Sequence, residues 1–498
     1  MRYGICALLR HWSSTPRTSG LRPTAIPVSS RPGPLQSRLY AAVSAADLQF
    51  GQPVHETHPH LLKPGELTPG ISALEYAQRR TKLASKLPEN GIAILAASDV
   101  KYRSGAVFYD FHQDSDFFYL TGFNEPEAVA VIGKSTANDD HSFQLYVRAK
   151  DPKAEQWEGS RSGVQAAVDV FNADESGDIK DIGKQLSRII SDASEVFTDA
   201  SPPRSSASAF SRLFASKTPP DVQGLATLLD QKSVKSLRNV LNEIRNIKSD
   251  AEISNMRKAG QASGRAFTEA MRQAWTAEKD LTAFLEYKFK RNGCDSSAYV
   301  PVVAGGKNAS QIHYVRNDDV LLEVDLVLAD AGGEYGNYIA DITRTWPISG
   351  TFTAPQKDLY NAILATQRTC IALCRADASN SLDKIHQIAE ASLKDSLARL
   401  GFDMSGNALE TLFPHHLGHY IGLDVHDTPG QSRKHPLQVG QCVTVEPGIY
   451  VPDTDRWPAA FRGMGIRIED SVCVQEEHPL VLSTEAVKEV DDIEALRA

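Results

Sequence analysis

Two hydrophobic periodicities alternate in the first half of the chain. Residues 75–87 (EYAQRRTKLASKL) carry apolar side chains at helical spacing, whereas residues 91–97 and 128–133 are short, β-branched apolar runs bounded by turn residues. The first pattern predicts an amphipathic helix and the other two predict strands. Because helices and strands continue to alternate to about residue 200, we expect an α/β domain there.

Signals of a boundary follow this first domain. Residues 201–209 and 218–220 are rich in proline and serine, which interrupt regular structure. Residues 233–249 have helical apolar spacing and predict a helix. Ser249, followed three residues later by Glu252, forms the pattern of a capping box, at which a new helix begins.

The first 46 residues differ in composition from the rest of the chain. They contain six arginines but no lysine and no acidic residue, and serine and threonine are frequent. This composition is typical of a mitochondrial transit peptide, which we predict for residues 1–40. A secretory signal would need a longer apolar core than residues 6–9, whereas a disordered basic tail stays open as an alternative.

Three further parts follow the predicted transit peptide. Residues 41–70 are rich in proline and glycine without periodicity, and we expect an extended arm there. An N-terminal domain is predicted at residues 71–235 and a second domain at residues 236–498. The predicted fold class is therefore α/β (α+β) with two folded domains.

Composition excludes several classes of protein. Hydrophobic residues make up 41% and charged residues 23%, as in an ordinary soluble chain. No run of 18 apolar residues is present, so we expect no transmembrane segment. The formal charge of −9 argues against a nucleic-acid partner. The six cysteines form no CxxC pair, which disfavours a disulfide scaffold or a thiolate zinc site.

Acidic residues interrupt apolar runs in the segment 320–347. Asp330 ends one apolar run and Asp341 lies within the next, with a glycine-rich turn between them. An ionised carboxylate in apolar surroundings is costly unless it is paired or bound to a metal. A hairpin would bring the two carboxylates near each other, although the sequence leaves the register open. Asp325 is expected at the turn edge of the strand.

Three further segments hold candidate ligands. The segment FPHHLGHYIGLDVHD contains four of the chain's 14 histidines, at positions 415, 416, 419 and 426. His415 and His419 could share one helix face, but no Glu follows the first as in the zinc-protease motif. Glu446 interrupts an apolar run, and Glu469 follows Arg467 with a spacing that would place both on one face of a strand.

The combined donor set is rich in oxygen, and its members are Asp330, Asp341, His419, Glu446 and Glu469. Such donors suit a hard divalent ion, and more than four ligands suit two ions that share carboxylates. Two ions about 3.5–4 Å apart can activate a water and stabilise the charge that develops in hydrolysis. The sequence therefore predicts a metal-dependent hydrolase.

These segments resemble the M24 metallopeptidases of the pita-bread fold. Within that family the chain is similar to the mitochondrial, intermediate-cleaving branch of the aminopeptidase P group. The resemblance covers about residues 51–498 and rests on YRSGAVFYDFHQDSDFFYLTGFNEPEA, IHYVRN, DAGGEYGNYIADITRTWP, HHLGHYIGLDVHD, VEPGIY and GIRIED together. It implies a creatinase/aminopeptidase P-type α/β domain followed by a pita-bread metallopeptidase domain.

The resemblance also implies roles for the metal ligands. Asp330 would hold one ion, His419 and Glu446 would hold the other, and Asp341 and Glu469 would bridge both. The preference of the family implies two Mn²⁺ ions per subunit, with Co²⁺ and Zn²⁺ left open.

By the same resemblance, further residues would act on the substrate. Glu446 would be the general base, His426 would stabilise the oxyanion and His313 would contact the substrate around the scissile bond. Arg467 would orient a ligand carboxylate, and His415 would line the product-side pocket.

Two positions concern specificity and assembly. Trp157 matches an aromatic position that lines the neighbouring site in bacterial relatives, which leaves a homo-oligomer open. Ala106 is a departure from the family pattern, because bacterial members often carry Asp there, and it puts in doubt how the amine end of the substrate is neutralised.

The function implied by the resemblance is that of a mitochondrial metalloaminopeptidase. It would remove a single residue from imported precursors after the processing peptidase has cut them, and so stabilise the mature proteins. We expect it in the matrix, with a peripheral association with the inner membrane and a second location left open. Removal of Tyr40 from its own sequence, before Ala41, would make the enzyme its own substrate.

Two alternatives stay open. An Xaa-Pro aminopeptidase or a prolidase would select a penultimate proline by shape, because its amide has no N–H. A metal-free pita-bread module that binds proteins would need no ligand set. The intact ligands, together with His313 and His426, argue against this second alternative.

Overall fold

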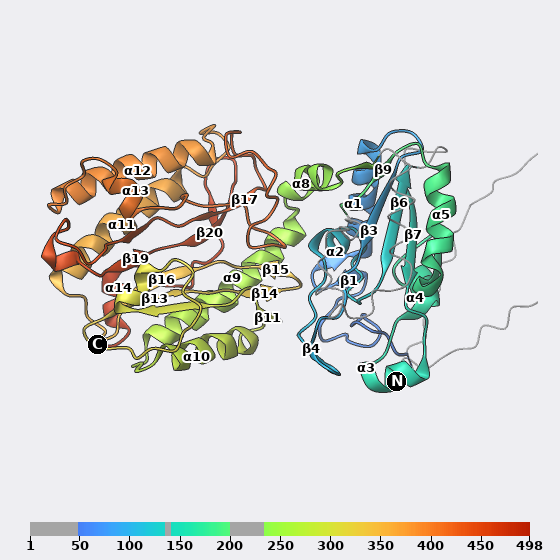
Figure 1. Ribbon diagram of the computed structural model, residues 1–498, viewed down its shortest axis with the longest axis horizontal. Helices are drawn as coiled ribbons and strands as arrows, with labels where there is room; N and C mark the ends of the chain where they lie inside the picture. The colour runs from blue at the N-terminus through green and yellow to red at the C-terminus, as the bar shows by residue number, and fades with distance from the viewer. Residues whose placement is uncertain (1–47, 135–140, 200–233) are drawn as a thin grey trace, which may run out of the picture. The chain divides into compact units, whose positions relative to one another are not determined.

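The computed structural model describes residues 48–134, 141–199 and 234–498 (Figure 1). The predicted transit peptide, the residues around Tyr40 and the two Pro/Ser-rich segments lie outside these ranges. The described residues of the predicted arm consist mostly of turns, and two of their side chains, Leu62 and Leu67, are buried. They end in β1 (Glu66–Thr68), which pairs with β2 (Ile71–Ser72).

A six-stranded mixed sheet forms the core of the first domain. Its strand order is β10-β9-β3-β6-β7-β8, in which β3, β6 and β7 are antiparallel neighbours and the outer pairs are parallel. The strands predicted at 91–97 and 128–133 are confirmed as β3 and β6. The strands of this sheet are β3 (Ile92–Ala96), β6 (Val129–Lys134), β7 (His141–Val147), β8 (Glu175–Asp178), β9 (Val196–Phe197) and β10 (Val234–Lys235).

The helix predicted at 75–87 is confirmed as α1 (Ala73–Lys86). It begins at Ser72, whose hydroxyl accepts a hydrogen bond from the Glu75 N–H, and it buries an apolar face that includes Tyr76. The other elements of this domain are the hairpin β4 (Tyr102–Ser104) and β5 (Val107–Phe108), and α2 (Ser115–Thr121), α3 (Pro152–Glu158), α4 (Gly163–Asp169) and α5 (Ile182–Asp192).

The helix predicted at 233–249 is shorter in the structure. Strand β10 occupies its first residues, and α8 spans Arg238–Asn246. The helical path is broken because Ser249 has an extended backbone, as a helix N-cap requires. The predicted capping box of Ser249 with Glu252 is confirmed, and it begins α9 (Asp250–Met271).

Short antiparallel sheets form the second domain. Their strand orders are β11-β14-β15, β12-β13-β16, β17-β20-β21 and β18-β19. The strands are β11 (Ser296–Ser297), β12 (Val302–Gly305), β13 (Leu326–Asp330), β14 (Gly333–Tyr335), β15 (Tyr338–Ile339), β16 (Thr343–Pro347), β17 (Cys442–Val445), β18 (Gly448–Tyr450), β19 (Gly465–Arg467), β20 (Asp470–Cys473) and β21 (Leu480–Val481).

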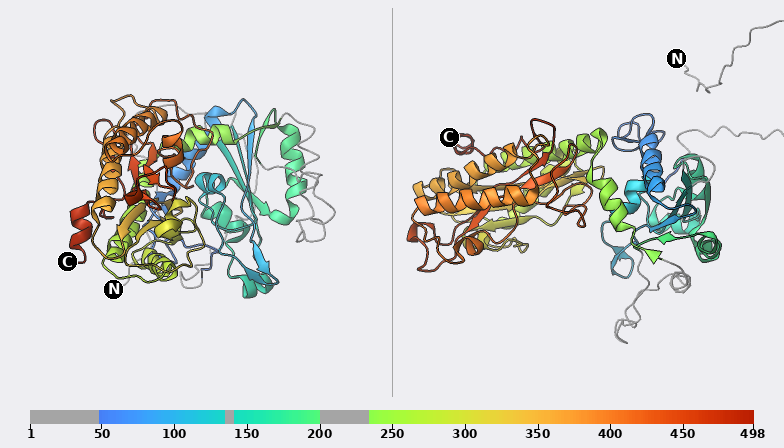
Figure 2. Two further views of the ribbon diagram at one scale, coloured as in Figure 1. Left: turned by 60° about the vertical axis from the view of Figure 1, so that its left-hand side comes forward. Right: turned by 90° about the horizontal axis from the view of Figure 1, so that it is seen from above.

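Two pairs of helices cover these sheets. α9 and α10 (Glu278–Arg291) pack against strands β11, β12, β14 and β15, whereas α11 (Ala354–Ala372) pairs with α12 (Leu382–Arg399) and packs on β17 and β19. In Figure 1 the strands β13, β16, β19 and β20 run between the two helix pairs, and Figure 2 shows the same elements from two further sides. The shorter helices are α13 (Ala408–Leu412) and α14 (Val490–Ala495).

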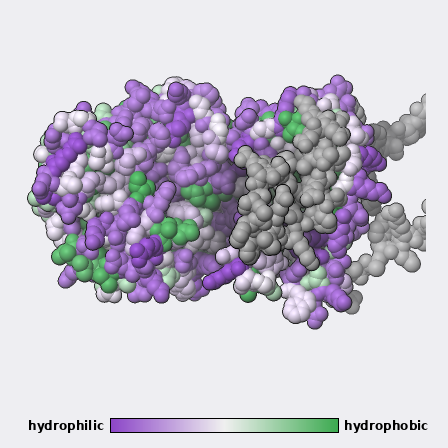
Figure 3. All heavy atoms as spheres, in the orientation of Figure 1, coloured by the Kyte–Doolittle hydropathy of each residue, from purple (hydrophilic) through white to green (hydrophobic). Residues whose placement is uncertain are grey.

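Hydrophilic residues cover most of the coloured surface in Figure 3, and hydrophobic residues form small, separate patches on that face. Within the described ranges of the chain, none of the helices combines the length and the apolar character needed to cross a membrane.

Candidate metal centre

The two candidate aspartates lie where strands end. Asp330 is the last residue of β13 and pairs with Thr343 on β16. The connection expected as a simple glycine-rich turn contains a second hairpin, β14–β15, and Asp341 lies between β15 and β16. A Cβ atom on Gly332 would lie 1.8 Å from the Ala340 carbonyl oxygen. Glycine is therefore required there for the hairpin that positions Asp341.

The two candidate glutamates lie in a break between two paired segments. β17 and β20 pair as far as Val445 and Asp470, and β18 and β19 pair on the other side of the break. Glu446 and Glu469 fall between these ladders, outside any strand. Arg467 and Glu469 are therefore not on one face of a continuous strand, as the sequence suggested. An interruption of pairing redirects side chains, and here both glutamates line one cavity.

His419 lies in an irregular loop and not on a helix. Because α13 ends at Leu412, the shared helix face suggested for His415 and His419 does not form. The His419 N–H donates to the Thr444 hydroxyl (3.0 Å), and the Thr444 N–H donates to the His419 carbonyl oxygen (2.9 Å). His419 Nδ1 lies 3.1 Å from the Tyr420 carbonyl oxygen. A hydrogen bond donated there leaves Nε2 free to bind a metal.

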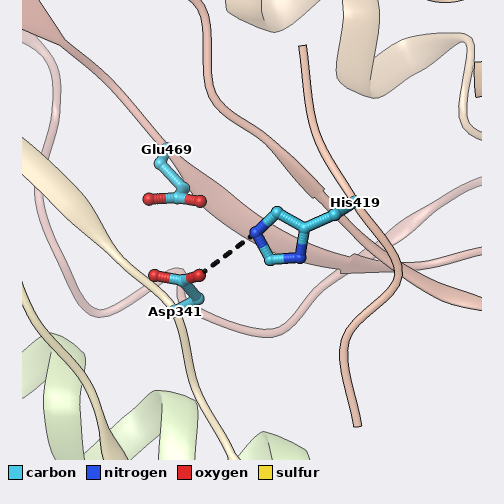
Figure 4. A group of neighbouring side chains, drawn as sticks. All are labelled: Asp341, His419 and Glu469. Carbon is cyan, nitrogen blue, oxygen red and sulfur yellow. Dashed lines mark ion pairs between the residues drawn. The ribbon is translucent and has the colours of Figure 1, made fainter. Parts of the chain in front are cut away.

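Three candidate ligands converge closely. Ligand atoms of Asp341, His419 and Glu469 all lie within 4.8 Å of one another, and the side chains point toward a common centre (Figure 4). His419 Nε2 is 3.5 Å from Asp341 Oδ2 and 3.6 Å from Glu446 Oε1. Together with Asp330, these residues line a cavity of about 400 Å³. The structure thus brings all five candidate ligands to one cavity.

Tyr299 contacts both aspartates, and pattern-based reasoning missed it. Its hydroxyl lies 2.7 Å from Asp330 Oδ1 and 2.5 Å from Asp341 Oδ1. Burial, followed by the charges of the two aspartates, raises the pKa of Tyr299 well above its usual value. The side chain is therefore a neutral donor that holds the two carboxylates at a fixed separation.

Arg467 connects Asp330 to Glu469 through hydrogen bonds. Its Nη2 donates to Asp330 Oδ2 (2.6 Å), its Nη1 to the Tyr450 hydroxyl (2.7 Å) and its Nε to the Thr343 hydroxyl (3.0 Å). The Thr343 hydroxyl in turn donates to Glu469 Oε2 (2.6 Å). Isolated hydroxyl residues such as Thr343 and Tyr450 carry no sequence signal, because they become informative only through these contacts.

Four acidic side chains lie close together in this cavity. Desolvation, reinforced by the neighbouring carboxylates, raises the pKa of Asp330 and Glu469, and it raises the pKa of Glu446 to about 7. Arg467 opposes these shifts, and His419 also opposes the shift of Glu446, but these are only two cationic groups beside four acids. The carboxylates need further positive charge to stay ionised together. The chemistry of the donor set therefore fits divalent cations.

The pKa values of His419 and Asp341 shift in opposite directions. Burial disfavours the charged form of each, but their interaction outweighs it, so the pKa of Asp341 is lowered. With the added charge of Glu446, the pKa of His419 rises to about 9. A metal ion bound at Nε2 would take the place of this proton.

Two further histidines line the opening of the cavity. His313 and His426 are both exposed, and the rings of His426 and His419 meet edge to face with their centroids 4.4 Å apart. Burial, followed by the charges of His419 and His313, lowers the pKa of His426. The ring is therefore neutral near pH 7 and has one N–H to donate.

His415 and Trp157 are not among the residues that line this cavity. His415 Nε2 lies 2.9 Å from the Tyr450 hydroxyl, and burial lowers the pKa of this histidine to about 4. Trp157 lies on α3 with 86% of its surface exposed.

Comparison with known proteins gives two matching families. Residues 76–197 match the family described as "Aminopeptidase P, N-terminal domain", and residues 254–476 match "Metallopeptidase family M24". The first match falls on the mixed sheet with α1, and the second contains all five candidate ligands.

The relatives cover nearly the whole chain. "Intermediate cleaving peptidase 55" of Saccharomyces cerevisiae is 47% identical over 90% of this chain and 88% of its own length. A crystal structure of Icp55 from the same yeast gives a TM-score of 0.79 at 45% identity, with 87% of this chain and 99% of that chain covered.

Two relatives from other organisms are also similar. "Xaa-Pro aminopeptidase 3" of Homo sapiens is 38% identical over 90% of each chain, and "Intermediate cleaving peptidase 55, mitochondrial" of Arabidopsis thaliana is 37% identical over 94% of this chain and 91% of its own. This chain therefore belongs to metallopeptidase family M24, and it carries an aminopeptidase P N-terminal domain ahead of a pita-bread peptidase domain.

Proposed function

We propose that this protein is a mitochondrial metalloaminopeptidase that removes a single residue from the N-termini of imported precursors after the processing peptidase has cut them. The observation that carries the proposal is the convergence of five ligand-type side chains, His313 and His426 on one cavity. Relatives named intermediate cleaving peptidase, one of them called mitochondrial, support the substrate class and the location. The acid-free, arginine-containing first 46 residues support import into the matrix.

In this proposal the five ligands hold two ions. Asp330 would bind one, His419 and Glu446 the other, and Asp341 and Glu469 both. We assign Mn²⁺ to both places because the family resemblance implies this ion, and a donor set dominated by oxygen suits it. Bound ions would polarise the substrate carbonyl and lower the pKa of a water molecule.

The protein's own groups would move protons and hold the substrate. Glu446 would take the proton of the attacking water. The N–H of His426 would stabilise the oxyanion, and His313 would hold the peptide around the scissile bond. Arg467, whose Nη2 is 2.6 Å from Asp330 Oδ2, would keep that carboxylate oriented.

The roles of two residues outside the cavity lining, and the domain boundaries, remain predictions. His415 would border the product-side pocket. Trp157 would reach the site of a neighbouring subunit, in which case the protein would act as a homo-oligomer.

Peptide cleavage by residues 41–498 tests the proposal. We expect removal of Tyr from a Tyr-Ala-Ala peptide to be faster than removal of Arg from an Arg-Pro-Pro peptide. A chelator should abolish both activities, and added Mn²⁺ should restore them better than Co²⁺ or Zn²⁺. A preference for Arg-Pro would instead identify an Xaa-Pro aminopeptidase. No cleavage of either peptide with any of the three metals would favour the protein-binding alternative.

The His426→Ala variant is expected to keep its metal and to lose about 10²–10³-fold in kcat, because removing one oxyanion donor has an effect of this size. Metal content and steady-state kinetics measure the two effects separately. His435→Ala is a matched control, because His435 is also an exposed loop histidine but does not line the cavity. Unchanged kcat in the His426 variant would remove the role assigned to this residue.

A further inference from the structure

The first residue of α10, Glu278, is a fully buried carboxylate. Its Oε1 accepts hydrogen bonds from the Gly305 N–H (2.8 Å) and from Asn308 Nδ2 (3.0 Å). Its Oε2 accepts from the Tyr314 hydroxyl (2.8 Å) and from the Asp319 N–H (2.9 Å). The Glu278 side chain therefore accepts hydrogen bonds from four residues of the segment 305–319.

Only a carboxylate fits this arrangement. All four partners of Glu278 are N–H or O–H donors, and each of its oxygens accepts two of them. A glutamine would turn an NH₂ group toward two of these donors, and both would lose the oxygen that accepts their hydrogen bonds. Because burying a charge is costly, this carboxylate needs all of its hydrogen bonds, and the segment is fixed in return.

The segment presents alternate sides to Glu278 and to the cavity. Ile312, His313 and Val315 line the cavity. Tyr314, between them, is 6% exposed and packs into a core cluster with Val302 and Leu328. A rotation of the segment that released the Tyr314 hydroxyl would therefore also move His313.

A second buried contact fixes the end of the same segment. The Asn317 side chain accepts a hydrogen bond from the Val303 N–H (2.8 Å) and donates one to the Pro301 carbonyl oxygen (2.8 Å). His313 thus lies on a short exposed stretch between buried anchors on both sides.

We propose that Glu278 and Tyr314 are positioning residues that hold His313 at the opening of the cavity. The inference rests on the proposed function, because it requires His313 to contact the peptide. Neither Glu278 nor Tyr314 lines the cavity, so we expect metal binding not to depend on them. Their effect is on the placement of His313, and misplacement by about 1 Å can lower a rate by as much as 10²-fold.

A double-mutant cycle in the full chain tests the proposal. Kinetics, metal content and melting temperature are measured for Tyr314→Phe, Glu278→Gln, His313→Ala and the Tyr314→Phe/His313→Ala double variant. Tyr360→Phe is the matched control, because it also removes a hydrogen bond of a buried tyrosine. The Tyr360 hydroxyl donates to the Lys488 carbonyl oxygen, and Tyr360 does not line the cavity.

The proposal expects Tyr314→Phe to lower kcat/KM by about 10- to 100-fold with unchanged metal content. In the His313→Ala background the same change should have no further effect on kcat/KM. Tyr360→Phe should lower the melting temperature to a similar extent and leave kcat/KM unchanged. If Glu278→Gln does not fold, the tyrosine variants alone decide the question.

Three results would overturn the inference, and the third is distinguishable from the first two. Multiplicative effects of the Tyr314 and His313 substitutions, or equal kinetics of the Tyr314 and Tyr360 variants, would show that Tyr314 acts only on stability. An unchanged kcat/KM in His313→Ala would refute the role of His313 in the proposed function, and the inference with it.

Discussion

The Asp341→Ala variant is expected to lose peptide hydrolysis, with kcat/KM lower by about 10³-fold or more. Metal ions contribute several kcal/mol to transition-state stabilisation, and each 1.36 kcal/mol is a factor of about ten. Asp341 lies within the group of ligand atoms that converge with His419 and Glu469. In the proposed arrangement it binds both ions, so its removal weakens both places at once.

Metal content and thermal stability report this effect independently of activity. A divalent ion at about 100 times its Kd should stabilise the unsubstituted protein by about 2.7 kcal/mol per site, and Asp341→Ala should lose most of that stabilisation. The quantity compared is the rise in melting temperature on adding metal, because in the metal-free protein the substitution also removes the ion-pair partner of His419.

Asp358→Ala is the control for this experiment, because Asp358 is an exposed aspartate outside the cavity lining. Full activity with a full complement of metal in Asp341→Ala would refute the role of Asp341 as a ligand.

Asp470→Ala is expected to destabilise the fold by about 3–5 kcal/mol, which is the usual cost of removing one partner from a buried ion cluster. Asp470 is 1% exposed, and its carboxylate accepts from Arg344 (2.7 Å), Lys488 (2.5 Å), Gln367 (2.7 Å) and Ser483 (2.7 Å). Without it, the buried guanidinium of Arg344 would lose its ion-pair partner.

The measurement is the melting temperature in the presence of a chelator. Without bound metal, any displacement of the neighbouring Glu469 cannot change the melting temperature by weakening metal binding. Asp491→Ala provides the contrast. The Asp491 side chain is 95% exposed and 3.7 Å from Lys357, and exposed pairs contribute little. Similar melting temperatures for the two variants would show that the Asp470 cluster adds no net stability.

The same cluster has a defined pH dependence. Burial raises the pKa of Asp470, but the charges of Arg344 and Lys488 outweigh it and lower the pKa well below its usual value. In acid, the unfolded state therefore binds a proton that the folded state does not. The contribution of Asp470 is fully present above about pH 4 and falls as the pH drops below that value. Asp470→Ala should flatten this part of the stability profile.

The candidate ligands could be read from the sequence because each acid stands in an apolar run, where a carboxylate is conspicuous. The sequence also predicted the helix α1, the strands β3 and β6, and the capping box of α9, all of which depend on local signals. The break between the β17–β20 and β18–β19 ladders could not be predicted, because it depends on the register of strands that are far apart in the chain.

The roles of residues that act only through tertiary contacts could not be predicted from the sequence either. Tyr299 stands in an unremarkable stretch, and nothing before residue 300 indicates that its hydroxyl will meet two aspartates from a later hairpin. Glu278 reads as an ordinary acid in the first turn of a helix. His415 and His419 look alike in sequence, and only the loop geometry gives them different surroundings.

The distribution of the ligands along the chain determines when the enzyme can first become active. The candidate ligands span residues 330 to 469, and the break that positions Glu446 forms only when β20 pairs with β17. A nascent chain on the ribosome, or one still passing through a translocation channel, has made or delivered most of its length before Glu469 becomes available. Such a chain lacks part of the proposed metal centre, so we expect peptidase activity to begin only after the second domain has folded.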